Sequence, residues 1–347
     1  MKKIGIKICI LFSFIGFICF CQCYFDTYNV FHWKKIRSLG IAMNNNFIKT
    51  KYVVNNPRKF NAFVFGSSRV GAINCEMLPK KYNDNELYWF NMTHHVGIPL
   101  EHFLSLKTFL ENNVDVEAVL LGFDEIAMYS SIEDHKKILV RIPYQTYEEN
   151  RLKFYIGYLR ETVPCYIMKK VFAYQPSEHL REVNAFYNYG EYVPFTLSLG
   201  TNPNLDEYKP SVKIEYTQKN SYTDIEKIFD LCKRHSIKLI AFTNPVYETT
   251  YRQAVDAGYF EFLRKVAQKC EFYNFSSLNN YSTDPKYYFE WSHYRPALGF
   301  VVQEFIFGTE EYREKVRDAA GDPFFGMKVN SENINEVIKH LENQINK

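Results

Sequence analysis

The sequence predicts an α/β fold in which a mainly parallel, doubly wound sheet is covered by helices on both faces. Runs that are apolar at every position, such as FNAFVFG (60–66) and VEAVLLGFD (116–124), are typical of strands buried on both sides. Longer amphipathic stretches separate these runs. Such alternation predicts right-handed βαβ crossovers and therefore a three-layer arrangement of helix, sheet and helix.

The individual elements follow from local signals in chain order. Pro99 stands at a favoured first-turn position of one helix, and Ser221 and Asp224 have the spacing of a capping box at the start of another. Expected strands are 60–66, 86–92, 116–124, 237–245 and 271–277, and expected helices are 99–113, 148–163, 221–236, 251–270 and 297–308.

The N-terminus carries an uninterrupted apolar segment from Ile8 to Phe25 in which only Gln22 is strongly polar. Its length of about 18 residues is close to the roughly 20 that a helix needs to cross a bilayer. The basic residues that precede it favour retention of this end in the cytoplasm, so the rest of the chain is expected on the outer side. A cleaved signal peptide is the alternative, but cysteines and aromatic residues stand where its small residues would be.

The remaining chain divides into four predicted parts. The anchor at 1–25 is followed by a polar connector at 26–58, an α/β domain at 59–310 and a helical tail at 311–347, whose periodic apolar residues predict a helix docked on the domain. An aromatic-rich insertion at 128–220 interrupts the domain. Aromatic residues make up 17% of the chain, which fits either core packing or a surface that faces carbohydrate or membrane.

Composition excludes several classes of function. The net charge of +3 provides no excess positive field for a phosphate backbone, so nucleic acid is not an expected partner. No nucleotide-binding glycine motif follows a strand, and no clustered carboxylates or paired cysteines indicate a metal. No cofactor is expected. The eight cysteines include four in or beside the apolar segment, and the spacing of the other four does not indicate a disulfide pairing.

Chemically active side chains follow the expected strands. Ser68 comes directly after the first strand, and Glu290 precedes His293 by three residues after the last one. Because ligands collect at the carboxyl ends of parallel strands, these side chains are expected to meet. A serine needs an adjacent base, and an acid that holds the far nitrogen of the imidazole completes a triad. Either motif alone is common in turns or cores, and His94 and His95 can equally be polar loop residues.

These motifs resemble those of the SGNH or GDSL-type hydrolases, and in particular the membrane-anchored branch that modifies extracellular polysaccharides. The first block of that family is similar to Phe65-Gly66-Ser67-Ser68, with Ser67 in place of an aspartate. The last block, Asp-x-x-His, is similar to Glu290-Trp291-Ser292-His293, with a longer acid. The resemblance spans about residues 60–125 and 220–308 and implies a flavodoxin-like three-layer sandwich.

The intermediate blocks of the family imply further site residues. The segment FNMTHHVGIP implies Asn91 and Gly97 as oxyanion or substrate-binding residues, and LGFDE places Asp124 where the family has a donor amide. An ionised carboxylate cannot donate to an oxyanion. Arg69 is expected to bind a substrate anion or to tie the active-site loops together. The alternative is a solvent-facing charge or a structural salt bridge with Asp124 or Glu125.

Two functions follow from this resemblance. The first is a serine acyltransferase or esterase, anchored in a bacterial inner membrane, that acts on O-acyl groups of a cell-envelope polysaccharide and receives acyl groups from a membrane protein. Ser68 would be the nucleophile, His293 the base and Glu290 the orienting acid. The second is a catalytically inactive glycan-binding or assembly protein of the same fold, which the replaced acid and Asp124 favour.

Overall fold

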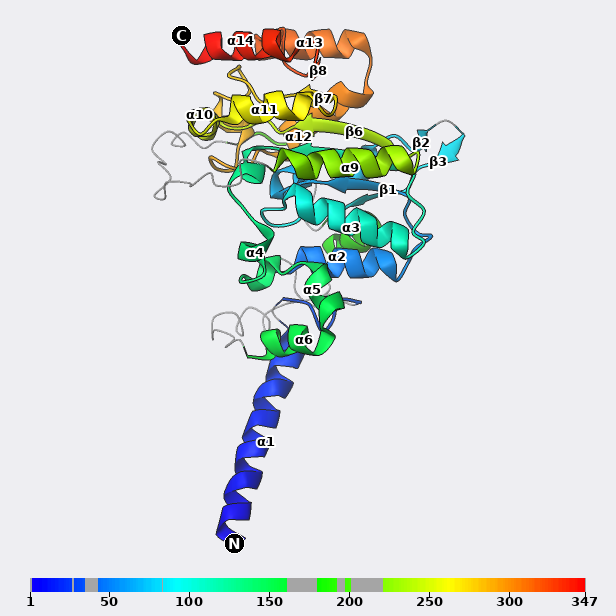
Figure 1. Cartoon of the computed structure of the whole chain (residues 1–347), viewed down its shortest axis with the longest axis vertical. Helices are drawn as coiled ribbons and strands as arrows, with labels where there is room; N and C mark the ends of the chain where they lie inside the picture. Colours follow the sequence, from blue (N-terminus) through cyan, green and yellow to red (C-terminus); the bar gives the residue numbers. More distant parts are fainter. Residues whose placement is uncertain are drawn as a thin grey trace.

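The computed structural model describes residues 2–26, 28–34, 43–82, 84–160, 180–191, 197–200 and 221–346. Its centre is a six-stranded sheet in the order β4-β1-β5-β6-β7-β8 (Figure 1). The first five strands in this order are parallel, and β8 is antiparallel to β7. The strands are β4 (Trp89–Asn91), β1 (Ala62–Phe65), β5 (Ala118–Phe123), β6 (Lys238–Thr243), β7 (Phe272–Asn274) and β8 (Met327–Val329). The expected mainly parallel sheet is therefore confirmed.

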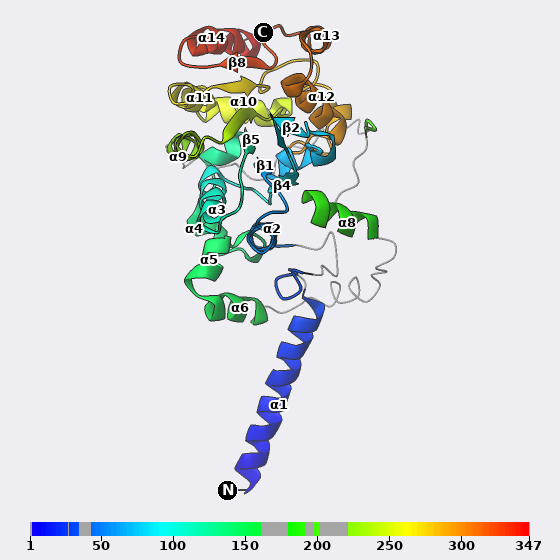
Figure 2. The ribbon, with the colours of Figure 1, turned by 90° about the vertical axis from the view of Figure 1, so that its right-hand side faces the viewer.

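Helices cover both faces of the sheet, as Figure 2 shows. One face packs against α3 (Pro99–Glu111), α9 (Tyr222–Arg234), α11 (Tyr259–Ala267) and α14 (Ile334–Ile345). The other packs against α12 (Pro296–Phe307) and α13 (Glu310–Ala320). Alternate residues of β1 face the two layers, with Phe63 and Phe65 in the first core and Ala62 and Val64 in the second. This two-sided burial explains why the strands are apolar throughout.

The strand order places a crevice beside the end of β1. The chain runs from β1 to β4 on one side and then returns to β5 on the other, with Phe65 paired to Leu121. In open parallel sheets the carboxyl ends of two such strands border the ligand site. The turns that follow β1 and β5 form η1 (Ser68–Ala72) and η3 (Glu125–Met128).

The expected helix at 251–270 is wrong in one respect, because the structure contains two helices there. The first, α10 (Glu248–Asp256), ends before Gly258, and α11 begins immediately after it. Gly258 has φ +99°, a left-handed conformation that glycine adopts easily. Similarly, Ser221 stands at the N-cap of α9 but makes no side-chain capping bond.

Part of the expected connector at 26–58 belongs to the folded domain. Helix α2 (Asn45–Val54) is mostly buried, and Phe47 and Ile48 lie in a third, smaller core. That core also contains side chains from α5 (Tyr144–Glu149), α6 (Arg151–Leu159) and α8 (Leu180–Tyr189). The polar composition hides this helix, because several of its asparagines and lysines are themselves buried.

The insertion and the tail are also partly described. Besides α5, α6 and α8, the insertion forms α4 (Ile132–His135) and η4 (Leu139–Arg141). The helix expected at 148–163 is divided in its described part, because its first two residues end α5 and α6 begins only after Asn150. The tail is not purely helical, since β8 extends the sheet before α14 begins. The other short elements in the described part of the chain are η2 (Cys75–Met77), η6 (Pro285–Tyr287) and the hairpin of β2 (Lys81–Tyr82) and β3 (Asn85–Glu86).

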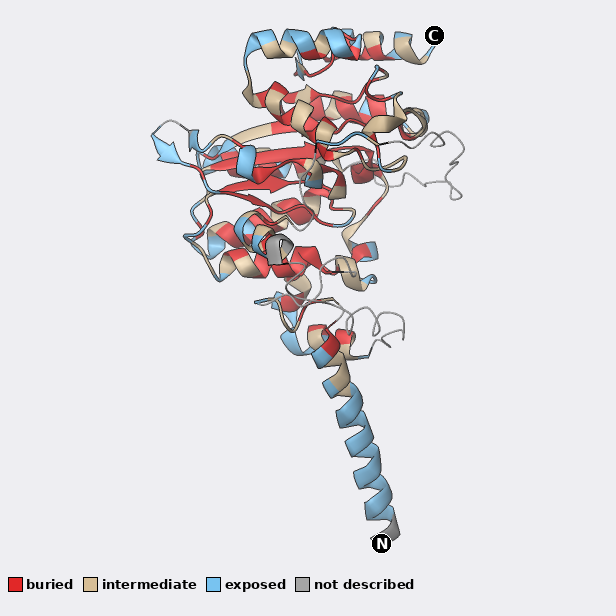
Figure 3. Ribbon diagram, turned by 180° about the vertical axis from the view of Figure 1, so that it is seen from behind, coloured by how far each residue is buried: buried red, intermediate tan, exposed pale blue. Residues whose placement is uncertain are grey.

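Helix α1 (Lys2–Phe25) projects away from the domain (Figure 1). Its segment Ile4–Phe25 is long and apolar enough to span a membrane, and its most apolar part is not buried against the rest of the chain. Figure 3 shows this helix as exposed over most of its length, in contrast to the buried sheet. A free-standing apolar helix of this length is consistent with a single-pass anchor.

Candidate active site

Gly66 sets the direction in which the chain leaves β1. It has φ +156°, and a Cβ at this position would lie 2.4 Å from Val70 Cγ2 and 2.9 Å from Gly122 O. Only glycine fits such a close approach of two strands. The chain turns here, Ser67 caps η1, and Ser68 becomes the first residue of this short helix.

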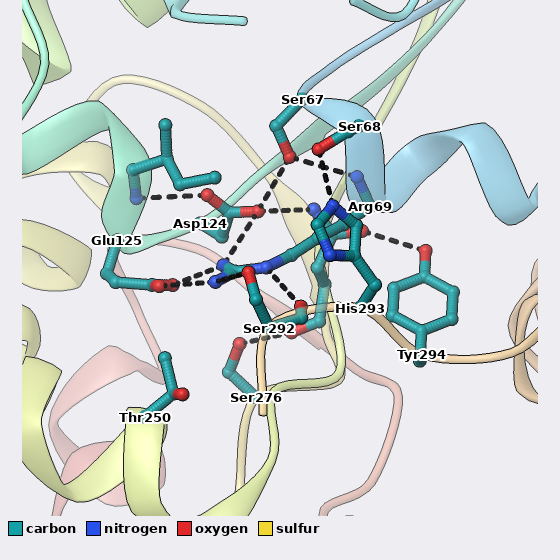
Figure 4. Close-up of polar contacts among 12 residues, drawn as sticks. Ser67, Ser68, Arg69, Asp124, Glu125, Thr250, Ser276, Ser292, His293 and Tyr294 are labelled. Carbon is teal, nitrogen blue, oxygen red and sulfur yellow. Dashed lines mark hydrogen bonds and ion pairs between the residues drawn. The ribbon is translucent and has the colours of Figure 1, made fainter. Parts of the chain in front are cut away.

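Ser68 and His293 lie in direct contact although they are 225 positions apart. Ser68 Oγ is 2.7 Å from His293 Nε2, and Figure 4 shows the hydroxyl directed at the ring. The other ring nitrogen, Nδ1, is hydrogen-bonded to Glu290 Oε1. Because a carboxylate only accepts, Nδ1 carries the proton and Nε2 is left to accept from the serine. The expected convergence of these three side chains is therefore observed.

Glu290 is oriented by the backbone of its own loop. The amides of Ser292 and His293 donate to its two oxygens at 2.9 and 2.8 Å. Partial burial opposes ionisation, but the bonds from His293 and from these amides outweigh it and lower the pKa of Glu290. The side chains of His293 and Glu290 remain 41% and 39% exposed, so a substrate can reach them. The longer acid thus still reaches the imidazole.

Arg69 joins the two active-site loops from below. Its guanidinium donates to both oxygens of Glu125 at 2.7 Å each, and its Nε donates to Ser292 O at 2.7 Å (Figure 4). The residue is 1% exposed. Burial disfavours the charge, but the carboxylates of Glu125 and Asp124 raise the pKa of Arg69 well above its usual value. Of the expected roles, the structure therefore supports loop tying through a buried salt bridge.

Asp124 does not act on the oxyanion side. It is 2% exposed, and its Oδ2 accepts from Ser67 Oγ at 3.2 Å and from Asn244 Nδ2 at 2.8 Å. Arg69 Nη1 lies 3.2 Å from the same oxygen. The expectation that Asp124 contributes to the oxyanion or substrate site is corrected, because all these contacts hold the carboxylate beneath the loop of Ser68. In this position it supports the turn after β1.

A cavity of about 710 Å³ opens above these residues. This volume is in the range of small-molecule sites. Ser68, Glu290 and His293 line one part of it, and residues of α2, β4 and the end of α8 line another. The described lining residues are Met43, Asn45, Lys49, Ser68, Arg69, Gly71, Ala72, Ile73, Asn91, Thr93, His94, His95, Val140, Gly190, Glu191, Phe289, Glu290, His293, Tyr294 and Pro296.

Of Asn91, the last residue of β4, and Gly97, which follows that strand, only Asn91 lines this cavity. Its Oδ1 accepts from the amide of Thr93 at 2.9 Å, and its buried Nδ2 has no partner among the described residues. Gly97 lies outside the cavity lining, and its amide already donates to His94 O at 3.1 Å. The oxyanion role expected of Gly97 is therefore corrected. A Cβ there would lie 2.8 Å from Gly66 O, so glycine permits close backbone packing instead.

His95 lines the cavity, whereas the sequence indicates no more than a polar loop residue at this position. Arg141 Nε donates to its Nδ1 at 3.0 Å, so the ring proton resides on Nε2. Desolvation and the charge of Arg141, followed by that of His293, lower the pKa of His95 to about 4. The ring is therefore neutral at pH 7 and offers an N–H donor at the cavity wall. Only its spatial proximity to Arg141 shows this role.

His94 also lines the cavity, but its ring is held in a buried network. Its Nε2 is 2.9 Å from Glu101 Oε2, while His135 Nδ1 is 2.8 Å from Glu101 Oε1. Burial opposes the charge on Glu101, but His94 and His135 lower the pKa of this carboxyl to about 2. The network fixes the loop that carries His95 to the first turn of α3. Among the described residues no group of histidine, cysteine or acidic side chains could hold a metal ion.

Comparisons with known proteins do not assign the chain to a family. No known protein family matches the sequence, and no characterised protein is significantly similar to it.

Proposed function

We propose that this chain is a membrane-anchored, extracytoplasmic serine acyltransferase or esterase that acts on O-acyl groups of a cell-envelope glycan. The observation that carries the proposal is the 2.7 Å contact between Ser68 Oγ and His293 Nε2, with Glu290 at the opposite ring nitrogen. A hydroxyl, an imidazole and a carboxylate in this order form the apparatus for acyl transfer. Their partial exposure in a cavity supports a catalytic rather than a structural role.

In this mechanism Ser68 Oγ attacks the acyl carbonyl while His293 Nε2 accepts the hydroxyl proton. The imidazolium formed is stabilised by Glu290, which also fixes the reactive tautomer. His293 then returns the proton to the departing alcohol, and the acyl group remains on Ser68. A sugar hydroxyl or water, deprotonated by His293, attacks this ester and releases Ser68. A sugar acceptor gives a transferase, whereas water gives an esterase.

The oxyanion needs donors at the same cavity. The amide of Ser68 is suited to this role because the first N–H groups of a helix have no partner within the helix. We assign the second donor to His95 Nε2–H, which replaces Gly97 in this role. The N–H of a neutral imidazole can donate a hydrogen bond to the oxyanion. Each oxyanion donor contributes roughly 3 kcal/mol in comparable enzymes.

The fold and the anchor support the wider proposal. When the parallel strands are numbered in chain order, their spatial order β4-β1-β5-β6-β7 reads 2-1-3-4-5. This order supports a flavodoxin-like sandwich of the SGNH type. Helix α1 supports attachment to a bacterial inner membrane, and Lys2, Lys3 and Lys7 favour an extracytoplasmic domain. An acyl donor held by a partner in the same membrane would be within reach of such a domain.

A fluorophosphonate probe, which reacts with activated serines, tests the proposal on the full chain in detergent. We expect labelling of the wild type and its loss in Ser68→Ala and His293→Ala. Ser331→Ala is the control, because Ser331 is an exposed serine of the tail that lies outside the cavity lining. Labelling should therefore persist in that variant.

Two results would contradict catalysis by this triad. One is a folded wild type that does not react with the probe or hydrolyse p-nitrophenyl acetate, which would favour the non-catalytic glycan-binding alternative. The other is labelling that survives Ser68→Ala. Release of acetate in the absence and presence of sugar acceptors then separates esterase from transferase activity.

A further inference from the structure

The cavity has a second polar region that the proposed triad does not use. It lies where α2, the end of β4 and the end of α8 meet, and four of its residues are Asn45, Lys49, Asn91 and Glu191. The first three are at most 6% exposed as residues. Side chains of this kind are seldom buried without partners, so their surroundings decide what they do.

Lys49 and Asn91 are held by the same residue, Thr93. Lys49 Nζ donates to Thr93 O at 2.7 Å, and Asn91 Oδ1 accepts from Thr93 N at 2.9 Å. An ammonium group has three donors, of which this bond uses one. The orientation of Asn91 is fixed, because its oxygen must face the Thr93 amide and its Nδ2 is then left without a partner. Two donor groups thus lie close together in the cavity wall.

Two acceptors lie in the same wall. Asn45 Oδ1 is buried and has no hydrogen-bond partner within the described part of the chain. Glu191 accepts from the amide of Cys75 at 2.7 Å through one oxygen, Oε1. Its position is set by Gly190, which has φ +73° and approaches Asn91 so closely that a Cβ would lie 2.2 Å from Asn91 O. The end of α8 is therefore docked against the end of β4.

We propose that Asn45, Lys49, Asn91 and Glu191 form a subsite that binds the hydroxyl groups of an uncharged sugar residue of the substrate. Each sugar hydroxyl both donates and accepts, and so it matches a wall that offers both kinds of group. A carboxylate or phosphate only accepts, and it would leave Asn45 Oδ1 unpaired and place a second anion near Glu191. Burial lowers the pKa of Lys49 and raises that of Glu191, each to about 7, so the pair carries little net charge and also favours a neutral ligand.

Apolar neighbours complete the match to a sugar ring. Met43, Ile73 and Val140 line the cavity, and so does Phe289, which is 47% exposed. Sugar-sized ligands bind in such clefts, where apolar surface is combined with a few placed polar groups. The inference deepens the proposed function and rests on it, since the sugar held here is the one whose oxygen exchanges the acyl group at Ser68.

The test is saturation-transfer NMR on the full chain in detergent, with glucose, galactose, mannose, N-acetylglucosamine and glucuronate as probes. The Ser68→Ala background excludes turnover. We expect transfer to at least one neutral sugar, weaker transfer to glucuronate, and at least a tenfold loss of affinity in Lys49→Met and in Asn45→Leu. Lys51→Met is the matched control, because Lys51 is a buried lysine of the same helix that bonds Tyr147 and lies outside the cavity lining.

Three outcomes would overturn the subsite: no transfer to any neutral sugar by the folded protein, tighter binding of glucuronate, or unchanged binding in both variants. Fluorophosphonate labelling separates this inference from the proposed function, because the small probe does not need the subsite. Labelling without sugar binding would contradict the subsite but not the proposed function. Sugar binding without labelling would leave the subsite and remove the acyl-transfer proposal.

Discussion

Replacing Arg69 by methionine should destabilise the protein and separate the two active-site loops. Methionine keeps much of the volume, but it leaves the Glu125 carboxylate, 1% exposed, without its bidentate partner. Removing one member of a buried ion pair typically costs about 3–5 kcal/mol. The bond from Arg69 Nε to Ser292 O is lost as well, so the loop of His293 is no longer tied to that of Ser68.

The measurement is urea unfolding of the full chain in detergent, followed by circular dichroism. We expect Arg69→Met to lower the free energy of unfolding by about 3–5 kcal/mol. The double variant Arg69→Met/Glu125→Leu removes this pair of charges and should recover part of the loss, since a hydrophobic replacement of a buried pair is often neutral, whereas Asp124 still loses its contact with Arg69. Asp124 keeps the bonds from Ser67 and Asn244 in this variant.

Probe labelling distinguishes the positioning role from stability. Because misplacement by about 1 Å can lower a rate roughly 100-fold, Ser68 should react slowly even in the stable double variant. A free energy of unfolding of Arg69→Met within about 1 kcal/mol of the wild-type value would contradict the tying role of Arg69, because this loss is well below the penalty for a broken buried pair. A stable double variant that is labelled at the wild-type rate would also contradict this role.

Four further changes test other parts of the site. Glu290→Gln should lower kcat for p-nitrophenyl acetate by roughly 10³–10⁴-fold, because the amide favours the wrong tautomer of the histidine; a wild-type rate would remove the acid from the mechanism. His95→Phe should lower kcat about 100-fold with little change in KM if its N–H serves the oxyanion, and a change in KM alone would contradict that role. The folded-state pKa of Glu101, about 2 against an ordinary 4.5, gives stability that is present above pH 4.5 and lost as the pH falls toward 2. The Glu101→Gln variant should therefore unfold more easily at pH 7, and its thermal midpoint should depend less on pH in that window. Burial lowers the pKa of Lys49 from 10.5 to about 7, which disfavours the folded state at pH 7 by up to about 4 kcal/mol, so Lys49→Met should raise the thermal midpoint even though one bond to Thr93 is lost. A lower midpoint would indicate that Lys49 is structural.

The sequence predicts the sheet and the pair of Ser68 and His293 for a physical reason. Strands buried on both faces must be apolar at every position, which makes them visible without any other information. Parallel strands also end at one edge, so residues that directly follow them are brought together even across long separations. Glu290 follows from its spacing to His293, because a side chain three residues away can reach back to the imidazole.

Other parts of the site depend on contacts that no local pattern records. Lys49 lies in a stretch whose polar composition resembles a connector, but α2 is buried by the insertion and the sheet. His95 and His94 are adjacent in the chain and look alike, and only Arg141 and Glu101 give them different roles. Asp124 looks like a site residue from its place after β5, whereas Arg69 draws it beneath the loop.

Some of the predicted helix and strand boundaries are wrong for similar reasons. The apolar pattern continues across Gly258, so the sequence predicts one helix where the left-handed backbone at this glycine starts a new one. Strand β8 has only three residues and gains its structure from pairing with β7, a contact that its own composition does not indicate.

The position of β8 has a consequence for how the chain can be shortened. β8 pairs with β7 from Phe272–Val329 to Asn274–Met327 and so covers the edge of β7. Helix α14 lies over the same end of the sheet. A chain cut before Met327 would present unpaired amide and carbonyl groups to solvent beside uncovered apolar side chains. An exposed edge strand of this kind can pair with a strand of another molecule. Such a truncation should therefore cause aggregation rather than give a smaller soluble domain.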